Sequence, residues 1–225
     1  MLTVFRTGLY GMTLLLLALV LAGRPAAAKD GESVRILAYG DSLVAGYGLP
    51  EDEAFPAQLE AALQQEGIDA EVINAGNSGD TTAAAVSRLD WVLAEDPDAA
   101  IVVFGGNDGL RGLDPAETYA NLDEVLSRLR ADGLPTLLTG MKAPRNLGAD
   151  YAKEFDAVFP RLAETHDIVF YPFFLEGVAA QPALNQADGI HPNARGVEKI
   201  VDKMLPDVRT LVRRAKKPAG EASGS

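Results

Sequence analysis

Five short apolar runs alternate with stretches of helical periodicity along this chain, and this alternation constrains the fold more than any other feature. The runs are the predicted strands, at residues 34–40, 71–76, 99–104, 135–141 and 167–171. Each is short, apolar and bounded by glycine or polar residues, as in a strand buried on both faces. Strands joined by helical crossovers lie parallel. The pattern predicts an α/β protein, a three-layer α/β/α sandwich with a five-stranded parallel sheet.

The stretches between the runs predict helices that cover the sheet. Apolar residues recur at helical spacing in five stretches: over 51–65, after Asp80 or Thr81, after Asp114-Pro115, over 151–165 and over 192–214. The inward face of the second helix is predicted to be Val86, Leu89 and Leu93. Pro160 is expected to interrupt the fourth of these helices, and Pro206 to bend the last. Residues 172–187 show no period.

The two ends of the chain differ in composition from the middle. Arg6 precedes an apolar block at 12–21, and Ala26-Ala27-Ala28 supplies small residues. This is the pattern of an export signal cleaved after Ala28, with an uncleaved anchor as the alternative. We therefore predict a signal peptide at 1–28, one domain at 29–215, a disordered tail at 216–225, and a periplasmic or secreted protein without stable membrane insertion.

Charge and composition exclude several classes of function. The formal net charge is -12, and it becomes -14 without residues 1–28, which hold two arginines and no acid. Such a field repels phosphate backbones, so nucleic acid is not an expected partner. The chain has no cysteine, which excludes a thiol nucleophile, disulfides and thiolate zinc sites. With only His166 and His191, a multi-histidine metal site is not expected either.

Polar residues follow several of the predicted strands, at the edge of the sheet where ligands bind in open α/β proteins. Ser42 follows the first strand, and Asp188 and His191 stand three residues apart before the last helix. A serine nucleophile needs a histidine base and a carboxylate that orients it. Taken singly, these residues are equally consistent with turns and helix caps.

Donors for an oxyanion are also available after the second and third strands. Gly79 offers an N–H that no Cβ obstructs, and Asn107 offers a side-chain amide. Ordinary turns at both places are the alternative. His166, in contrast, stands at a predicted helix end, where it suits the helix dipole, and we interpret it as structural.

Four blocks resemble the signature blocks of the SGNH (GDSL) hydrolases, in that family's order. They are Gly40-Asp41-Ser42-Leu43, Gly79 within Asn77-Ser78-Gly79-Asp80-Thr81, Gly105-Gly106-Asn107-Asp108 and Asp188-Gly189-Ile190-His191-Pro192. The sequence is most similar to the branch of exported bacterial arylesterases, acyl-CoA thioesterases and lysophospholipases. The resemblance implies a flavodoxin-like fold with Ser42 as nucleophile, His191 as base and Asp188 as orienting acid. It further implies an oxyanion hole of Ser42 N–H, Gly79 N–H and the Asn107 amide.

The same resemblance implies a hydrolase for carboxylic esters or thioesters of acyl groups, including aryl esters, acyl-CoA and lysophospholipids, through an acyl-enzyme on Ser42. A carbohydrate O-acetylesterase and a non-catalytic lipid- or glycan-binding module are the alternatives. We expect no cofactor, no metal and a monomer. Substrate contacts are assigned to Asp41, Leu43, Ser78, Asp80, Met141, Pro144 and Ile190.

Overall fold

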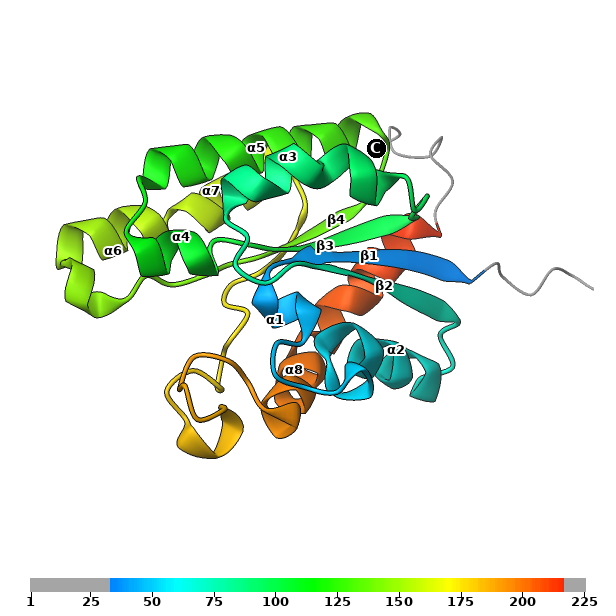
Figure 1. Ribbon diagram of the computed structural model, residues 1–225. Helices are drawn as coiled ribbons and strands as arrows, with labels where there is room; N and C mark the ends of the chain where they lie inside the picture. The colour runs from blue at the N-terminus through cyan, green and yellow to red at the C-terminus, as the bar shows by residue number, and fades with distance from the viewer. Residues whose placement is uncertain (1–32, 217–225) are drawn as a thin grey trace, which may run out of the picture. The chain divides into compact units, whose positions relative to one another are not determined.

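A five-stranded parallel sheet forms the middle layer of the computed structural model, which describes residues 33–216 (Figure 1). Its strands are β1 (Val34–Gly40), β2 (Ala70–Gly76), β3 (Ala99–Val103), β4 (Thr136–Thr139) and β5 (Val169–Tyr171). Their order in the sheet is β2-β1-β3-β4-β5, which is the flavodoxin-like order. The chain changes direction across the sheet at β1, so the crevice of such folds is expected at the carboxyl end of this strand.

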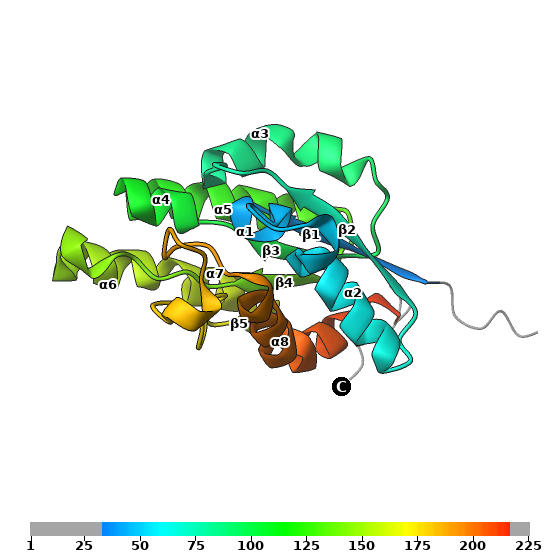
Figure 2. The same ribbon diagram turned by 60° about the horizontal axis from the view of Figure 1, so that its bottom comes forward.

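Helices cover both faces of the sheet, which confirms the predicted three-layer architecture. One face carries α2 (Phe55–Gln65) and α8 (Ala194–Ala215), and the other carries α3 (Thr82–Leu93), α5 (Pro115–Ala131) and α7 (Val158–His166) (Figures 1 and 2). Shorter helices are α1 (Ser42–Ala45), α4 (Gly106–Arg111) and α6 (Ala149–Asp156), with 3-10 turns at η1 (Glu51–Glu53), η2 (Arg145–Leu147) and η3 (Pro182–Leu184). Figure 1 shows α1 and α4 together at the end of the sheet where the strands finish.

The core lies on both sides of the two central strands. All five residues of β3 are buried, and six of the seven residues of β1 are buried as well. From above and below, apolar stripes pack onto them, including Leu122, Val125 and Leu129 of α5 and Val197, Ile200 and Met204 of α8. Strands buried on both faces read as continuous apolar runs, which is why the sequence showed them clearly.

Several helix boundaries differ from the prediction. The predicted helix at 151–165 is two helices, α6 and α7, and the break lies at Ala157, not at Pro160. Pro160 instead occupies the first turn of α7, where a proline's missing N–H removes no helical hydrogen bond. The predicted helix at 51–65 begins with η1, and α2 starts only at Phe55, with a proline in its first turn.

The inward faces of the other helices follow the prediction with small shifts. In α3 the fully buried apolar residues are Ala85, Leu89 and Val92, whereas Val86 and Leu93 are half-buried. The last helix starts at Ala194, because the side chain of Asn193 caps it by accepting from Gly196 N. Its interior proline is Pro206, as the sequence indicated.

The two ends of the chain lie outside residues 33–216. The predicted signal peptide at 1–28 lies outside the described residues, and so does the predicted tail apart from Lys216. Among residues 33–216, no helix has both the length and the apolar character that crossing a membrane requires.

Glycines at the ends of β1 and β2 allow α1 to lie against the sheet. Gly40 and Gly76 are paired in register, and a Cβ added at Gly76 would lie 2.1 Å from the backbone nitrogen of Ala45 in α1. A Cβ at Gly40 would lie 2.3 Å from a methyl group of Val44. This close approach fixes the height of α1, and with it the position of Ser42, above the sheet edge.

We predict that Gly76→Ala destabilises the fold by about 3 kcal/mol, because backbone atoms of α1 must move to admit the methyl group. Gly67→Ala is the control: its Cβ would meet no atom within 4 Å, so only its positive φ of 74° adds strain, at about 1 kcal/mol. Urea unfolding measures both. Equal losses of stability in the two variants would contradict the steric explanation.

Candidate active site

Ser42 is the first residue of α1 and is separated from the end of β1 by Asp41 alone. Asp41 caps this short helix, since its Oδ1 accepts a hydrogen bond from Leu43 N at 3.0 Å. Gly46 ends the helix in the left-handed conformation. The turn therefore has an acid to start it and a glycine to stop it, and it presents the side chain of Ser42 at the carboxyl edge of the sheet.

The predicted triad of Ser42, His191 and Asp188 is assembled in the structure. Ser42 Oγ lies 3.0 Å from His191 Nε2, and His191 Nδ1 lies 2.7 Å from Asp188 Oδ2. The first two residues are 149 positions apart in the chain, so only the fold brings them together. An ionised Asp188 accepts from Nδ1–H, which leaves Nε2 free to accept the proton of the Ser42 hydroxyl.

Asp188 is held in its ionised form by its hydrogen bonds. The bond from the His191 side chain, together with those from the backbone N–H groups of His191 and Ile190, lowers the pKa of Asp188 from 3.8 to about 2. Hydrogen bonds to a carboxylate favour its charged form. Asp188 is therefore ionised at neutral pH.

Two residues that the sequence analysis missed support the imidazole. The ring of Tyr47 lies 4.6 Å from that of His191, centroid to centroid, at an angle of 38°. Gln186 Nε2 donates to the carbonyls of Tyr47 at 2.7 Å and Pro192 at 2.9 Å, while Gln186 N donates to His191 O at 2.8 Å. Gln186 thus joins the loop that carries His191 to the loop that follows Ser42. No periodicity or motif in the sequence indicates this contact.

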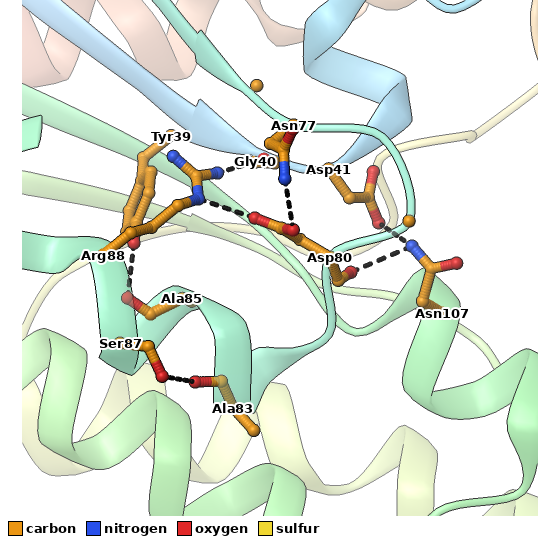
Figure 3. A network of polar contacts seen from close by, with 12 residues as sticks. Tyr39, Gly40, Asp41, Asn77, Asp80, Ala83, Ala85, Ser87, Arg88 and Asn107 are labelled. Atoms are coloured by element: carbon orange, nitrogen blue, oxygen red, sulfur yellow. Dashed lines mark hydrogen bonds and ion pairs between the residues drawn. The ribbon is translucent and has the colours of Figure 1, made fainter.

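Asn107, in the first turn of α4, directs its amide group toward the serine turn. Its Nδ2 donates to Asp41 Oδ2 at 3.2 Å and to the carbonyl of Asp80 at 2.9 Å (Figure 3). These two acceptors fix which way the amide faces. Next to it, the buried carboxylate of Asp108 accepts from Thr82 N at 3.1 Å and so ties α4 to the start of α3.

A second buried cluster holds the loop between β2 and α3. Arg88 of α3 donates to Asp80 Oδ2 at 2.6 Å and to Gly40 O at 2.8 Å, and its guanidinium lies 4.5 Å from the ring centroid of Tyr39 (Figure 3). The other oxygen of the Asp80 carboxylate accepts from Asn77 Nδ2 at 2.6 Å. Both oxygens of Asp80 are therefore used in fixing the loop. Arg88 was not singled out from the sequence.

Gly79 lies in this same loop with a positive φ of 89°. No atom lies within 4 Å of the position that a Cβ would take, and Arg111 of α4 donates to its carbonyl at 2.9 Å. The neighbouring Asp80 carbonyl is bonded to Asn107, so the fold brings the Gly79 loop against the Asn107 helix. Gly79 itself does not line the cavity described below.

Burial changes the titration of Asp41. Its side chain is 1% exposed, and this desolvation raises the pKa of Asp41 from 3.8 to about 6, against the opposing effects of the bonds from Leu43 and Asn107. Burial disfavours the charged form of a carboxyl group. Asp41 is thus an acid at the site whose charge is sensitive to pH near 6.

A cavity of about 630 Å³ opens beside the triad. Ser42, His191 and Asn107 line one end, and most of the remaining wall is apolar, with Leu110, Met141, Pro144, Phe173 and Ile190. Of the predicted substrate contacts, the cavity is lined by Asp41, Leu43, Met141, Pro144 and Ile190, but not by Ser78 or Asp80. A second hollow of about 620 Å³ beside α5, α6 and α7 has neither a serine nor a histidine in its wall.

His166 is not part of this site. It is the last residue of α7, and its Nε2 lies 2.8 Å from Asp123 Oδ1 of α5. Its side chain is buried at the junction of these helices. This position agrees with the structural role interpreted from the sequence.

Comparison with known proteins identifies the family to which the chain belongs. The GDSL-like lipase/acylhydrolase family matches residues 38–199, which span all four sequence blocks. The chain belongs to this family. Family membership confirms the predicted SGNH hydrolase and its fold class.

Individual relatives agree with this assignment. Esterase TesA of Pseudomonas aeruginosa is 39% identical over 197 residues, covering 87% of this chain and 96% of its own. Thioesterase 1/protease 1/lysophospholipase L1 of Escherichia coli is 39% identical over 197 residues, 87% of this chain and 91% of its own. Among solved structures, the SGNH-hydrolase family esterase AlinE4 is 54% identical with a TM-score of 0.69, over 80% of this chain and 97% of that one. The SGNH hydrolase described here is a serine esterase.

We predict that Gln186→Leu lowers kcat about tenfold, because the histidine loop loses its side-chain bonds to Tyr47 and Pro192. KM and the urea midpoint should change little, since Gln186 is only half-buried and water can replace its bonds. Gln181→Leu is the control, because its exposed side chain does not cap the turn that follows it. A kcat equal to that of the control would show that Gln186 does not position His191.

We predict that Asp41→Asn changes the pH dependence of stability. A raised folded pKa means that the contribution of Asp41 to stability is complete below about pH 3.8 and is lost as pH rises through about 6. As the pH rises through this range, the free energy of unfolding of the variant should therefore increase by about 3 kcal/mol relative to that of wild type. Urea unfolding at several pH values measures this, with the exposed Asp150→Asn as a control for lost charge. A constant difference would contradict the burial effect.

Proposed function

We propose that this SGNH hydrolase cleaves esters of acyl chains through a covalent acyl-enzyme on Ser42. The observation that carries the proposal is the continuous line of contacts from Asp188 through His191 to the hydroxyl of Ser42, at 2.7 and 3.0 Å. Both distances are within hydrogen-bond reach, as an activated nucleophile requires. The line ends at a cavity large enough for a substrate.

Acylation begins when Ser42 Oγ attacks the carbonyl carbon of the ester. The hydroxyl proton passes to His191 Nε2 as the new C–O bond forms, and Asp188 stabilises the resulting imidazolium. His191 then gives this proton to the departing alcohol or thiol as the bond between the carbonyl carbon and the leaving group breaks. Water repeats the sequence on the acyl-enzyme, which releases a carboxylic acid and restores Ser42.

The oxyanion formed in each step is assigned to the N–H groups of Ser42 and Gly79 and to the amide of Asn107. Asn107 supports this role best, because it lines the cavity and its Nδ2 faces the serine turn. Its two acceptors, Asp41 and the Asp80 carbonyl, hold the amide with its nitrogen, not its oxygen, toward the site. Both hydrogens of this amide are donated in the structure, so one of the two bonds is exchanged for a bond to the oxyanion when the negative charge develops.

The cavity favours an acyl chain over an acetyl group. Its volume of about 630 Å³ and its wall of leucine, methionine, proline and phenylalanine exceed what one methyl group requires. Two relatives of this chain are named as an esterase and as a thioesterase/lysophospholipase, and both names denote enzymes that act on acyl substrates. We therefore propose acyl esters and thioesters as substrates ahead of acetylated carbohydrates, and a catalytic protein ahead of a binding module.

We further propose that the enzyme acts after export, in the periplasm or outside the cell, as a monomer. Support for export is the pattern of Arg6, the apolar block at 12–21 and the alanines at 26–28. The absence of cysteine and the acidic composition are compatible with that environment. The assignment of a signal peptide at 1–28 remains a prediction from sequence.

We predict that Ser42→Ala lowers kcat for 4-nitrophenyl acyl esters by at least about 10⁴-fold, with an unchanged urea midpoint. A fluorophosphonate should label the wild-type protein at Ser42, as mass spectrometry of peptides would show, and should not label the variant. Thr165→Ala, which replaces an exposed hydroxyl on α7, is the control and should retain full activity. Retained hydrolysis in Ser42→Ala would overturn the assignment.

The same assay separates the two substrate classes. Acyl esters of four to eight carbons should give a kcat/KM about tenfold or more above that of the acetate ester, since each buried methylene contributes about 0.8 kcal/mol. A clear preference for acetylated sugars would instead support the O-acetylesterase alternative.

A further inference from the structure

Two cationic side chains stand on the wall of the catalytic cavity, and they differ in what they contact. Arg145 Nη2 donates to Asp156 Oδ2 at 2.8 Å, so its charge is balanced by a carboxylate. Lys142 forms no ion pair with any residue in the described part of the chain. Its ammonium lies instead 4.6 Å from the ring centroid of Phe173, which also lines the cavity.

This contact restrains a side chain that would otherwise be free. Lys142 is exposed, and a lysine in solution samples many rotamers. A cation over an aromatic face gains about 0.5–1 kcal/mol at an exposed site, which favours the rotamers that keep the ammonium at the wall. The charge is therefore presented to the cavity while its hydrogen atoms remain available to a ligand.

Three carboxylates that line the cavity or are bonded to residues of its wall have other partners. Asp41 is buried and accepts from Leu43 N and Asn107, Asp188 is bonded to His191, and Asp156 accepts from Arg145 and from Ala143 N. Among residues 33–216, the Lys142 ammonium has no carboxylate as an ion-pair partner. Low-dielectric walls strengthen its local field over that of the distant acids.

We propose that Lys142 is a specificity residue that binds an anionic group of the substrate. The enzyme then prefers acyl esters that carry a carboxylate, sulfonate or phosphate over neutral esters of the same size. The anion belongs either to the acyl chain or to the leaving group, since both must pass through this cavity. This inference rests on the proposed esterase mechanism and adds the charge of the preferred substrate to it.

Two matched pairs of esters test the proposal. In the first pair, mono-4-nitrophenyl adipate carries its anion on the acyl chain, and 4-nitrophenyl hexanoate is the neutral partner. In the second pair, the acetate ester of 4-hydroxybenzenesulfonate carries the anion on the leaving group, and the acetate ester of 4-(methylsulfonyl)phenol is neutral. The ratio of kcat/KM within each pair is compared across variants, so differences in chemical reactivity cancel.

The variants are Lys142→Met, which keeps an apolar side chain, and Lys142→Arg, which keeps the charge. Lys153→Met is the matched control, because Lys153 is an exposed cation on α6 that lines the other hollow and not this cavity. We expect Lys142→Met to lower the anionic-to-neutral ratio about fivefold in one pair, the size of a partly exposed ion pair. Lys142→Arg and Lys153→Met should retain the wild-type ratio.

Salt provides a second readout that a packing role would not change. The wild-type preference should shrink between about 0.1 M and 1 M salt, as the Debye length falls from about 10 Å to about 3 Å, and the Lys142→Met ratio should not. The pair that responds identifies the source of the anion. Equal ratios for wild type and Lys142→Met in both pairs would overturn the inference while leaving the esterase mechanism intact. Failure of wild type to cleave either member of both pairs would overturn both.

Discussion

Parallel pairing of β1 with β2 on one side and β3 on the other is the constraint on which the rest of the site depends. Gly40 is opposite Gly76 in one pair and Val103 in the other, so the three strands finish at one level. Ser42, the Gly79 loop and Asn107 each follow one of these ends within a few residues. His191 joins them because α8 must begin near the same edge to return along the sheet. The register of the sheet thus brings together residues that are far apart in the sequence.

Above that edge, the polar side chains of Arg88, Asp80 and Asn107 hold the loops in place through hydrogen bonds. Arg88 illustrates the principle, since its guanidinium reaches the end of β1 through Gly40 O and the β2–α3 loop through Asp80, while its plane contacts Tyr39 (Figure 3). A buried charge without such partners would be costly. Asn107 then extends the same network to Asp41, so the loops of three strands are joined by side chains of two helices.

The sequence predicted the elements that are set by local physics and missed those set by distant contacts. Apolar runs and caps were enough for the five strands, for the Asp114 cap of α5 and for Pro206 within α8. The sequence also predicted Ser42, His191 and Asp188 as a triad from four weak signals in a known order, and the fold brings these three side chains into contact. In contrast, α4 forms in a glycine-rich segment with little helical preference, because Asp108 is bound to Thr82 of α3. Gln186 and Tyr47 meet across 139 residues, and neither carries a local signal.

The pKa values of two carboxylates of the site are shifted in opposite directions, and their surroundings explain the difference. Asp188 is exposed and accepts three hydrogen bonds from His191 and Ile190, so its pKa falls to about 2 and it can stabilise a developing imidazolium. Asp41 is buried, so its pKa rises to about 6 even though it also accepts two bonds. Exposure to solvent therefore affects these two pKa values more than the number of hydrogen-bond donors does. Because Asp41 accepts from Asn107 and caps the Ser42 turn, a carboxyl group in that position links the geometry of Ser42 to that of Asn107, whereas Asp188 contacts His191 and its own loop.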